Sequence, residues 1–278
     1  FEEFGNYLWH YDVTGHAMAE VLEKALRPGD EYRGVALTTG SAGTIACGDY
    51  LKKLFPSSKI IASEALQCPT LLNNGFGAHR IEGIGDKHVP WIHNVKNTDL
   101  VVAIDDNAVV DIVRLFNEPE GKKYLLRNGV PEELVSTLDL LGFSGIANLL
   151  SVIKFAKYYE LGEQDVVLTV LTDSMELYSS RILELREQVG EFTEIDAAET
   201  FARHLLGVGT DNLLELTYES KKRVHNLKYY TWVEQQGKTY EEIQAQWYQT
   251  DYWTEVQKLA PEIDVLIEEF NAEVGLLK

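Results

Sequence analysis

The sequence is poor in cysteine, in basic residues and in long apolar runs. Its two cysteines, Cys47 and Cys68, cannot supply a disulfide framework or a multi-cysteine zinc site, so we expect buried free thiols. The seven histidines do not occur at metal-binding spacings, and we assign no metal. No run of about 18 apolar residues is present, and residues 1–12 do not resemble a signal peptide. We therefore expect a soluble cytoplasmic protein.

The shortage of basic residues makes the chain strongly acidic. Its 278 residues include 25 Lys and Arg against 44 Asp and Glu, which gives a formal net charge of −19. A field of this sign repels polyphosphate backbones and anionic headgroups, so we expect neither nucleic acid nor membrane as a partner. The short basic run Lys221–Arg223 is interpreted as a solvated face. The hydrophobic share of 45% is that of a folded globular protein with one large or two small domains.

Residues 1–190 alternate short apolar runs with segments of helical periodicity. The predicted strands are 35–38, 59–63, 100–104 and 165–171, and the predicted helices are 42–54, 105–117 and 144–159. Apolar strands separated by helices indicate βαβ units. The predicted fold class is therefore α/β, a parallel or mixed sheet with helices on both faces. Residues 165–171, DVVLTVL, have the sequence of a fully buried strand.

The pattern changes at about residue 190. In residues 191–278 the apolar residues recur at helical spacing, in 197–206, 212–227, 240–247 and 261–270. We predict an all-helical C-terminal extension. Its tryptophans are Trp232, Trp247 and Trp253. Aromatic residues on helices most often form a core or an interface, and a substrate-binding cluster is the less common alternative.

A glycine-rich turn follows the first predicted strand. Residues 35–48 read VALTTGSAGTIACG, which is a strand, a small-residue turn and then a helix. Glycines let the backbone turn tightly, and the amides at the helix N-terminus then point outward together as a cradle for an anion. Hydrogen bonds to a charged group contribute about 1.5–3 kcal/mol each, against roughly 0.3–1 kcal/mol for the helix dipole. The turn is neither a dinucleotide nor a Walker motif, and alone it is equally consistent with a purely structural turn.

Further blocks follow this turn in a recognisable order. They are KIIASE at 59–64, HRIEGIGDKHVP at 79–90, GFSG at 142–145 and VVLTVLTDSMELY at 166–178. Together with residues 1–15 and the turn, these blocks resemble the cysteine synthase family. Its members are pyridoxal-phosphate enzymes that share the fold of the tryptophan synthase β subunit. The resemblance runs from Phe1 to Tyr178 and implies the same fold and cofactor here.

The resemblance also implies roles for individual residues. The cofactor phosphate would be held by Gly40, Ser41, Ala42, Gly43 and Thr44. Ser144 would place its hydroxyl at the pyridine nitrogen, and a neutral hydroxyl does not force that nitrogen to stay protonated. Such a site suits β-elimination and β-replacement better than transamination. A loop on the substrate side would consist of Gly83, Ile84 and Gly85, and the ring side of the pocket would be supported by Asp173 and Ser174.

Some of these residues also have ordinary structural explanations. Ser144 is suited to cap the helix that follows it, and residues 83–85 are consistent with a simple turn. The sequence departs from the family at Ala42, where glycine is usual and where alanine requires a negative φ. It departs again at Met175 and Leu177, where a small residue and an arginine are usual.

No block resembles the segment that holds the family's Schiff-base lysine, so we assign no catalytic residue in this chain. Lys59, Lys87 and Lys154 lie outside any such motif. The resemblance implies that this lysine lies upstream, in an N-terminal part of the fold in the same or a partner chain. We predict that residues 1–190 form part of the catalytic fold and that residues 191–278 form the extension.

The expected function is that of a pyridoxal-phosphate-dependent lyase or transferase. It would catalyse β-elimination or β-replacement on a small serine- or cysteine-type amino acid, and the family implies a homodimer. The alternative is a non-catalytic binding or regulatory protein that uses the helical extension as its contact surface.

Overall fold

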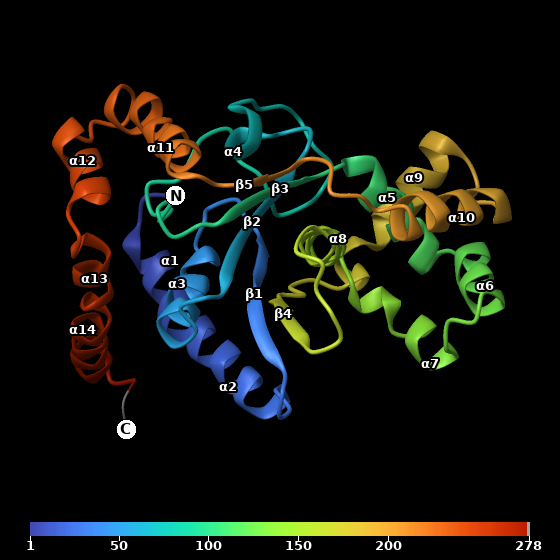
Figure 1. Cartoon of the computed structure of the whole chain (residues 1–278), viewed down its shortest axis with the longest axis horizontal. Coiled ribbons are helices and arrows are strands. Elements are labelled where there is room, and N and C mark those ends of the chain that lie inside the picture. The colour runs from blue at the N-terminus through green and yellow to red at the C-terminus, as the bar shows by residue number, and fades with distance from the viewer. Residues whose placement is uncertain (277–278) are drawn as a thin grey trace.

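The computed structural model describes residues 1–276, and a five-stranded sheet forms its centre (Figure 1). The strands are β1 (Glu31–Thr38), β2 (Lys59–Ala65), β3 (Leu100–Ile104), β4 (Asp165–Thr169) and β5 (Leu213–Glu215). Their order across the sheet is β4-β1-β2-β3-β5. The first four strands are parallel, and β5 pairs antiparallel with β3. The predicted α/β fold class with a mixed sheet is confirmed.

Helices connect the strands and continue after them. Up to β3 they are α1 (Phe4–Trp9), η1 (His10–Thr14), α2 (Gly15–Ala25), α3 (Ile45–Leu54) and α4 (Thr70–Asn73). Between β3 and β4 they are α5 (Asp106–Asn117), α6 (Pro119–Arg127), α7 (Glu132–Val135), η2 (Leu138–Leu140) and α8 (Phe143–Tyr158). After β4 they are η3 (Met175–Tyr178), α9 (Ser179–Val189), α10 (Glu194–Thr200), η4 (Phe201–Leu206), α11 (Tyr218–Asn226), η5 (Tyr229–Val233), α12 (Tyr240–Tyr248), α13 (Tyr252–Gln257) and α14 (Leu259–Glu273).

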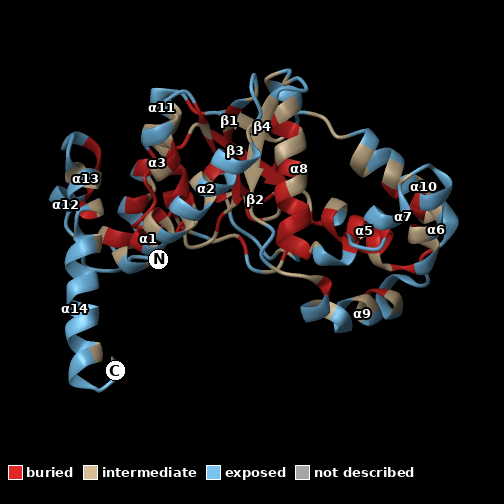
Figure 2. Cartoon of the chain, turned by 90° about the horizontal axis from the view of Figure 1, so that it is seen from below, coloured by how far each residue is buried: buried red, intermediate tan, exposed pale blue. Residues whose placement is uncertain are grey.

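The two faces of the sheet are covered by different helices. Val35 and Leu37 of β1 pack in one cluster with Leu22 of α2 and Leu51 of α3. Ala36, which lies between them on the strand, belongs to the cluster formed by α5 and α8. This alternation follows from the two-residue period of a strand, and it buries both faces of β1 (Figure 2).

Strand β4 is less buried than its sequence predicts. All five of its residues are only half-buried, because β4 lies at the edge of the sheet and pairs with β1 alone within residues 1–276. The prediction of a fully buried strand at 165–171 is therefore wrong. The apolar pattern identified the strand correctly but contains no information on its place in the sheet.

The C-terminal region is helical as predicted, except for β5. The helix predicted over 212–227 begins later, because Leu213–Glu215 pair with β3, and Thr217 then caps α11 by accepting a hydrogen bond from the Ser220 N–H. Strand β5 joins this region to the sheet. The domain boundary at residue 190 stays a prediction.

The tryptophans of the extension pack in the protein core, whereas several of its tyrosines are exposed. Trp232 packs in a buried cluster with Tyr7, Tyr11 and Trp91, and the Trp253 ring lies 5.3 Å from the Tyr7 ring. The structure thus confirms the core interpretation for these tryptophans. Cys47 and Cys68 are buried free thiols, as expected, and burial raises the pKa of Cys47 to about 12.

The basic run on α11 does not form a solvated face, so that interpretation is wrong. All three residues of Lys221–Arg223 are half-buried. Lys221 donates to the Lys96 carbonyl at 2.9 Å, and the Arg223 guanidinium donates to the Leu71 carbonyl at 2.8 Å. Their charged ends anchor α11 to the body of the protein.

Among residues 1–276, no single helix is long and apolar enough to cross a membrane. One pair of segments, Glu132–Leu140 and Phe143–Tyr158, reaches that length only jointly and is bent by 119°. Much of Phe143–Tyr158, which is α8, is buried against the sheet and α5.

Candidate functional site

The predicted site segments meet at one edge of the sheet, where the parallel strands have their carboxyl ends. The Gly85 N–H donates to the Thr39 carbonyl at 2.9 Å, so the 83–85 loop lies against the turn after β1. The Gly142 N–H donates to the Asp173 carbonyl at 2.7 Å, so the start of α8 lies against the segment after β4. In open parallel sheets this edge is where ligands bind.

Asn148 of α8 joins these two halves. Its side-chain oxygen accepts a hydrogen bond from the Thr38 N–H at 2.7 Å, and its side-chain nitrogen donates to the Val170 carbonyl at 2.8 Å. Asn148 is 1% exposed. Our sequence interpretation did not include it, although a lone amide in an apolar helix, one turn after Ser144, is a recognisable indication.

The turn after β1 presents unpaired amides. Within residues 1–276, the N–H groups of Gly40, Ser41, Ala42 and Thr44 donate to no protein acceptor. They lie at the N-terminus of α3, a ten-residue helix. Unpaired N–H groups at a helix N-terminus form a binding site for an anion.

Ala42 in this turn has a φ of +64°. The expected negative φ is therefore wrong, and the residue adopts the left-handed conformation that costs an L-residue roughly 1–2 kcal/mol. Its methyl group is buried with Ile45, Ile60 and Leu71. That burial offsets part of the strain, which explains how alanine is tolerated here.

Two glycines of the site are required by their neighbours. A Cβ at Gly43 would lie 2.5 Å from the side chain of Asn6, whose Nδ2 donates to the Ser41 hydroxyl at 3.0 Å. Gly85 has a φ of +84°, and a Cβ there would lie 2.6 Å from Nε2 of His79. These contacts explain the glycines sterically and leave their functional roles as predictions.

Ser144 does not cap α8. The N-cap is Gly142, so Ser144 is the second residue of the helix and the capping alternative is wrong. Its hydroxyl lies 2.9 Å from the hydroxyl of Thr172, and the residue is 5% exposed. Because Asn148 lies one turn further along α8, Ser144 shares the helix face that points to the ends of β1 and β4.

A hydrogen bond from Tyr178 fixes the segment that follows β4. The Tyr178 hydroxyl donates to Asp173 at 2.8 Å, and burial together with this carboxylate raises the pKa of Tyr178 to about 12. Ser174 directly precedes η3. Of the two departures from the family, Met175 is buried in the core and Leu177 is exposed.

A small polar cavity lies beside the turn, and our sequence interpretation did not include it. Its volume is about 10 Å³, and Thr39, Gly40, Glu64 and Asp86 are among its lining residues. Glu64 accepts hydrogen bonds from the N–H groups of Leu71 and Leu72, and burial raises its pKa to about 7. In the sequence, this cavity was indicated by Glu64, a carboxylate near the end of a buried strand.

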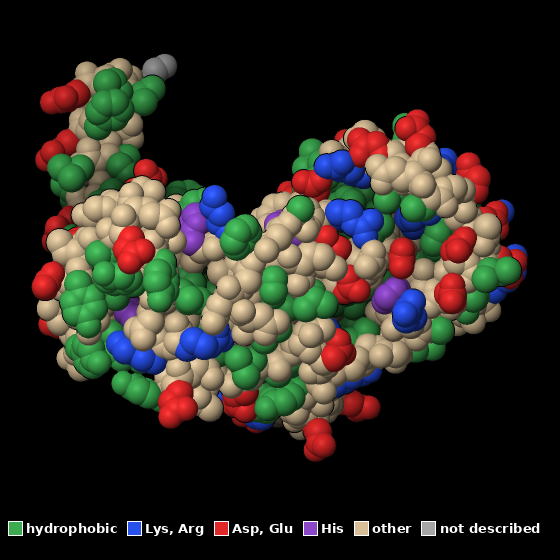
Figure 3. All heavy atoms as spheres, turned by 90° about the horizontal axis from the view of Figure 1, so that it is seen from above, with side chains coloured by type: hydrophobic (Ala, Val, Ile, Leu, Met, Phe, Trp, Pro, Cys, Tyr) green, Lys and Arg blue, Asp and Glu red, His purple; other side chains and the backbone are tan. Residues whose placement is uncertain are grey.

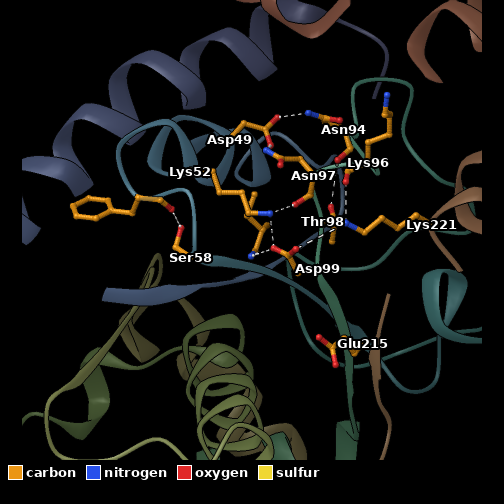
Figure 4. A network of polar contacts seen from close by, with 12 residues as sticks. Asp49, Lys52, Ser58, Asn94, Lys96, Asn97, Thr98, Asp99, Glu215 and Lys221 are labelled. Carbon is orange, nitrogen blue, oxygen red and sulfur yellow. Dashed lines mark hydrogen bonds and ion pairs between the residues drawn. The ribbon is translucent and has the colours of Figure 1, made fainter. Parts of the chain in front are cut away.

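Helix α3 is held in place by a polar network behind the turn (Figure 4). Asp49 is buried and accepts hydrogen bonds from the amides of Asn94 and Asn97, at 2.9 and 2.6 Å. Burial raises the pKa of Asp49. Lys52 pairs with Asp99 at 2.6 Å, which in turn accepts from the Ile60 N–H. The network therefore fixes α3 to β2 and to the segment that leads into β3.

Comparison with known proteins gives sequence relatives and structural neighbours, although no family model matches. A cysteine synthase of Staphylococcus aureus is 28% identical over 181 residues, which cover 65% of this chain and 51% of the relative. A cystathionine beta-synthase of Apis mellifera is 26% identical over 184 residues, which cover 64% of this chain and 32% of the relative. This chain is thus similar in sequence to cysteine synthases. It spans about half the length of the cysteine synthase it matches.

A solved structure supports the same fold. The hydrogen sulfide-producing enzyme of Fusobacterium nucleatum superposes with a TM-score of 0.52 at 22% identity. The match covers 78% of this chain and 56% of that enzyme. At this identity the likeness establishes the fold.

The residues of the turn fit the phosphate of the cofactor that the resemblance implies. The turn offers four unpaired N–H groups, contains no carboxylate side chain and lies at the positive end of α3. In an acidic chain, such amides hold a phosphate without an arginine. Lys154 is committed to Asp211 at 3.0 Å and Lys87 is exposed, so neither is assigned to the site.

Proposed function

We propose that this protein is a pyridoxal-phosphate-dependent enzyme that catalyses β-elimination or β-replacement on a small serine- or cysteine-type amino acid. The observation that carries the proposal is the anion cradle at residues 40–44, with its four unpaired N–H groups, in contact with the 83–85 loop through the Gly85 to Thr39 hydrogen bond. The relatives named above are of the cysteine synthase and cystathionine beta-synthase type, which supports the same chemistry.

Pyridoxal phosphate, when bound, withdraws electrons from the α-carbon of an amino acid. In this proposal the N–H groups of residues 40–44 bind the phosphate and fix the position of the ring. Ser144 holds the ring nitrogen through its hydroxyl, which Thr172 orients. Because that hydroxyl is neutral, it would not force the nitrogen to stay protonated, and such a site would suit β-elimination and β-replacement better than transamination.

The other predicted residues shape the pocket around the ring and the substrate. Asp173, fixed by Tyr178, supports the ring side together with Ser174. The 83–85 loop leaves room for the substrate, because neither Gly83 nor Gly85 has a side chain and Ile84 is buried. We propose that a further polypeptide segment, in the same or a partner chain, supplies the lysine to which the cofactor attaches.

The test is an activity panel on the protein as isolated from its source, with any polypeptide that co-purifies. The protein is incubated with pyridoxal phosphate and with serine, O-acetylserine, cysteine and a diamino acid, and sulfide, pyruvate, ammonia and new amino acids are measured. Release of a β-substituent that depends on the cofactor supports the proposal. Bound cofactor without turnover of any β-substituted amino acid contradicts it and favours the non-catalytic alternative.

A further inference from the structure

Helix α14 leaves the body of the protein without a partner. None of the residues of Leu259–Glu273 is buried, and only its first turn touches the core, through Ala260. Figures 2 and 3 show the helix as an arm that projects into the solvent. An isolated helix of about 15 residues is only marginally stable in water. We therefore expect another surface to pack against α14.

One face of this arm is apolar along its whole length. Ile263, Leu266 and Phe270 recur at the three- and four-residue spacing of a single helix face. Phe270 is 60% exposed and Leu266 is 62% exposed. Leu259, Ile267 and Val274 extend the same face and are also exposed. A continuous apolar stripe of this kind marks a surface that binds another surface.

The charges on the arm restrict what that surface can be. Both sides of the apolar stripe are acidic, and the arm has no basic residue within Leu259–Glu273. The acidic residues are Glu262, Asp264, Glu268, Glu269 and Glu273. None of them forms an ion pair with any residue of 1–276. Two arms packed against each other would bring acidic sides together, so the complementary surface has to be apolar with cations at its rim.

The same chain has such a surface. A groove of about 740 Å³ lies between α11, η5 and α12. Its aromatic wall includes Tyr230, Tyr240 and Tyr248, which are 54–62% exposed. Lys222 lies in the groove with its Nζ 4.6 Å from the ring of Tyr248 and 4.5 Å from that of Trp247.

The Lys222 ammonium at this groove has no ion-pair partner within residues 1–276. Lys222 pairs with no carboxylate among residues 1–276, and Arg223 donates only to the Leu71 and Leu72 carbonyls and the Asn74 side chain. Lys96 also lies beside Trp247, with its Nζ 5.8 Å from the ring. The groove therefore offers an aromatic wall with the unpaired Lys222 ammonium, beside one carboxylate, Glu219. The arm offers an apolar stripe flanked by carboxylates, which is complementary to that wall and that cation.

We propose that the α14 arm of one copy of this chain docks in the α11–η5–α12 groove of a second copy, and that the exchange is reciprocal. Within one chain, α13 leads from α12 straight into α14, and α14 runs away from α11 (Figure 1). A reciprocal exchange closes as a two-fold dimer and leaves no arm uncovered. This proposal does not depend on the catalytic function proposed above.

The first test is the oligomeric state of the full chain, measured by sedimentation velocity over a range of concentrations. The wild type is expected to be a dimer, and Phe270→Asp should raise the dissociation constant by at least about tenfold. Val265→Asp is the matched control, because Val265 lies on the opposite side of α14 and is also exposed, at 54%. A monomeric wild type, or equal effects of the two substitutions, would overturn the proposal.

The second test identifies the surface that covers the arm. A photo-crosslinking amino acid at position 270 should form crosslinks to α11 or α12 of the other copy, and Lys222→Glu should abolish them while circular dichroism stays unchanged. Crosslinks between two α14 helices, or to a different protein, would contradict the assignment of the groove. Restoration of the dimer when Lys222→Glu is combined with Glu262→Lys and Glu273→Lys, which border the apolar stripe, would confirm the charge complementarity.

Discussion

The side-chain oxygen of Asn148 accepts a hydrogen bond from the Thr38 N–H at 2.7 Å, while the side-chain nitrogen donates to the Val170 carbonyl. One side chain on α8 thus holds the ends of β1 and β4 at a fixed separation. The cradle at residues 40–44 and the segment 172–174 begin within three residues of those two strand ends. Asn148 is therefore a positioning residue for the proposed site.

Replacing Asn148 with leucine should lower the free energy of unfolding by about 2–5 kcal/mol, because it leaves a buried N–H and a buried carbonyl unpaired. The measurement is urea unfolding. Asn73→Leu is the control, because Asn73 is exposed and its side chain makes no hydrogen bond within residues 1–276, and it should change stability by about 0.5 kcal/mol or less. Equal effects of the two substitutions would show that Asn148 does not have this role.

The charge of the cradle is tested at Ser41. Ser41→Asp places a carboxylate beside the unpaired N–H groups and should weaken binding of inorganic phosphate or pyridoxal phosphate by at least about tenfold. Ser41→Asn has nearly the same shape without the charge and should bind within a fewfold of the wild type. Isothermal titration calorimetry measures both. Unchanged binding by Ser41→Asp would place the anion elsewhere.

Because the backbone at Ala42 is strained, we predict that replacing this buried residue with glycine changes stability only slightly. Ala42→Gly relieves a strain of roughly 1–2 kcal/mol but loses a buried methyl group and gains freedom in the unfolded chain, so stability should change by about 0.5 kcal/mol or less. Ala46→Gly in α3 has no strain to relieve and should cost about 1–2 kcal/mol. Chemical denaturation of both variants measures the contrast. A large loss for Ala42→Gly would contradict the left-handed conformation.

Glu64 should make stability depend on pH. Its pKa is raised from 4.5 to about 7, because burial disfavours the ionised carboxylate. Below the unfolded-state pKa of 4.5, Glu64 is protonated in both states and its contribution to stability is complete. As pH rises from 4.5 through about 7, the unfolded chain loses this proton more readily than the folded protein, so that contribution is lost. Between pH 4.5 and 8 the wild type should therefore lose about 3 kcal/mol more than Glu64→Gln. The histidines are present in both proteins and cancel in this comparison, so identical pH profiles would refute the shift.

The elements of the central sheet could be predicted because they depend on local patterns. The apolar run at 100–104 is strand β3, and the amphipathic segment after it is α5. Two features of the sheet could not be read locally. The edge position of β4 is set by the order of the strands, and β5 is too short, at three residues, for its period to be distinguished from that of the following helix.

The candidate site was predictable as a set of segments but not in its geometry. The four segments meet at the sheet edge because parallel strands place their carboxyl ends together. The φ of Ala42 and the capping of α8 by Gly142 in place of Ser144 depend on contacts distant in sequence, such as the Gly142 to Asp173 hydrogen bond. Asn148 was overlooked for the same reason, since its partners, Thr38 at the end of β1 and Val170 just after β4, are distant in the sequence.

The most direct test of the account is a nuclear magnetic resonance titration of the isotopically labelled chain with pyridoxal phosphate. We predict that the largest amide shifts occur at residues 40–44, with smaller shifts at Gly85 and Ser144. Inorganic phosphate should shift residues 40–44 and leave Ser144 unchanged, because it has no ring. Shifts confined to other parts of the molecule, or an absence of shifts at residues 40–44 with either compound, would contradict the assignment of this turn as the phosphate site.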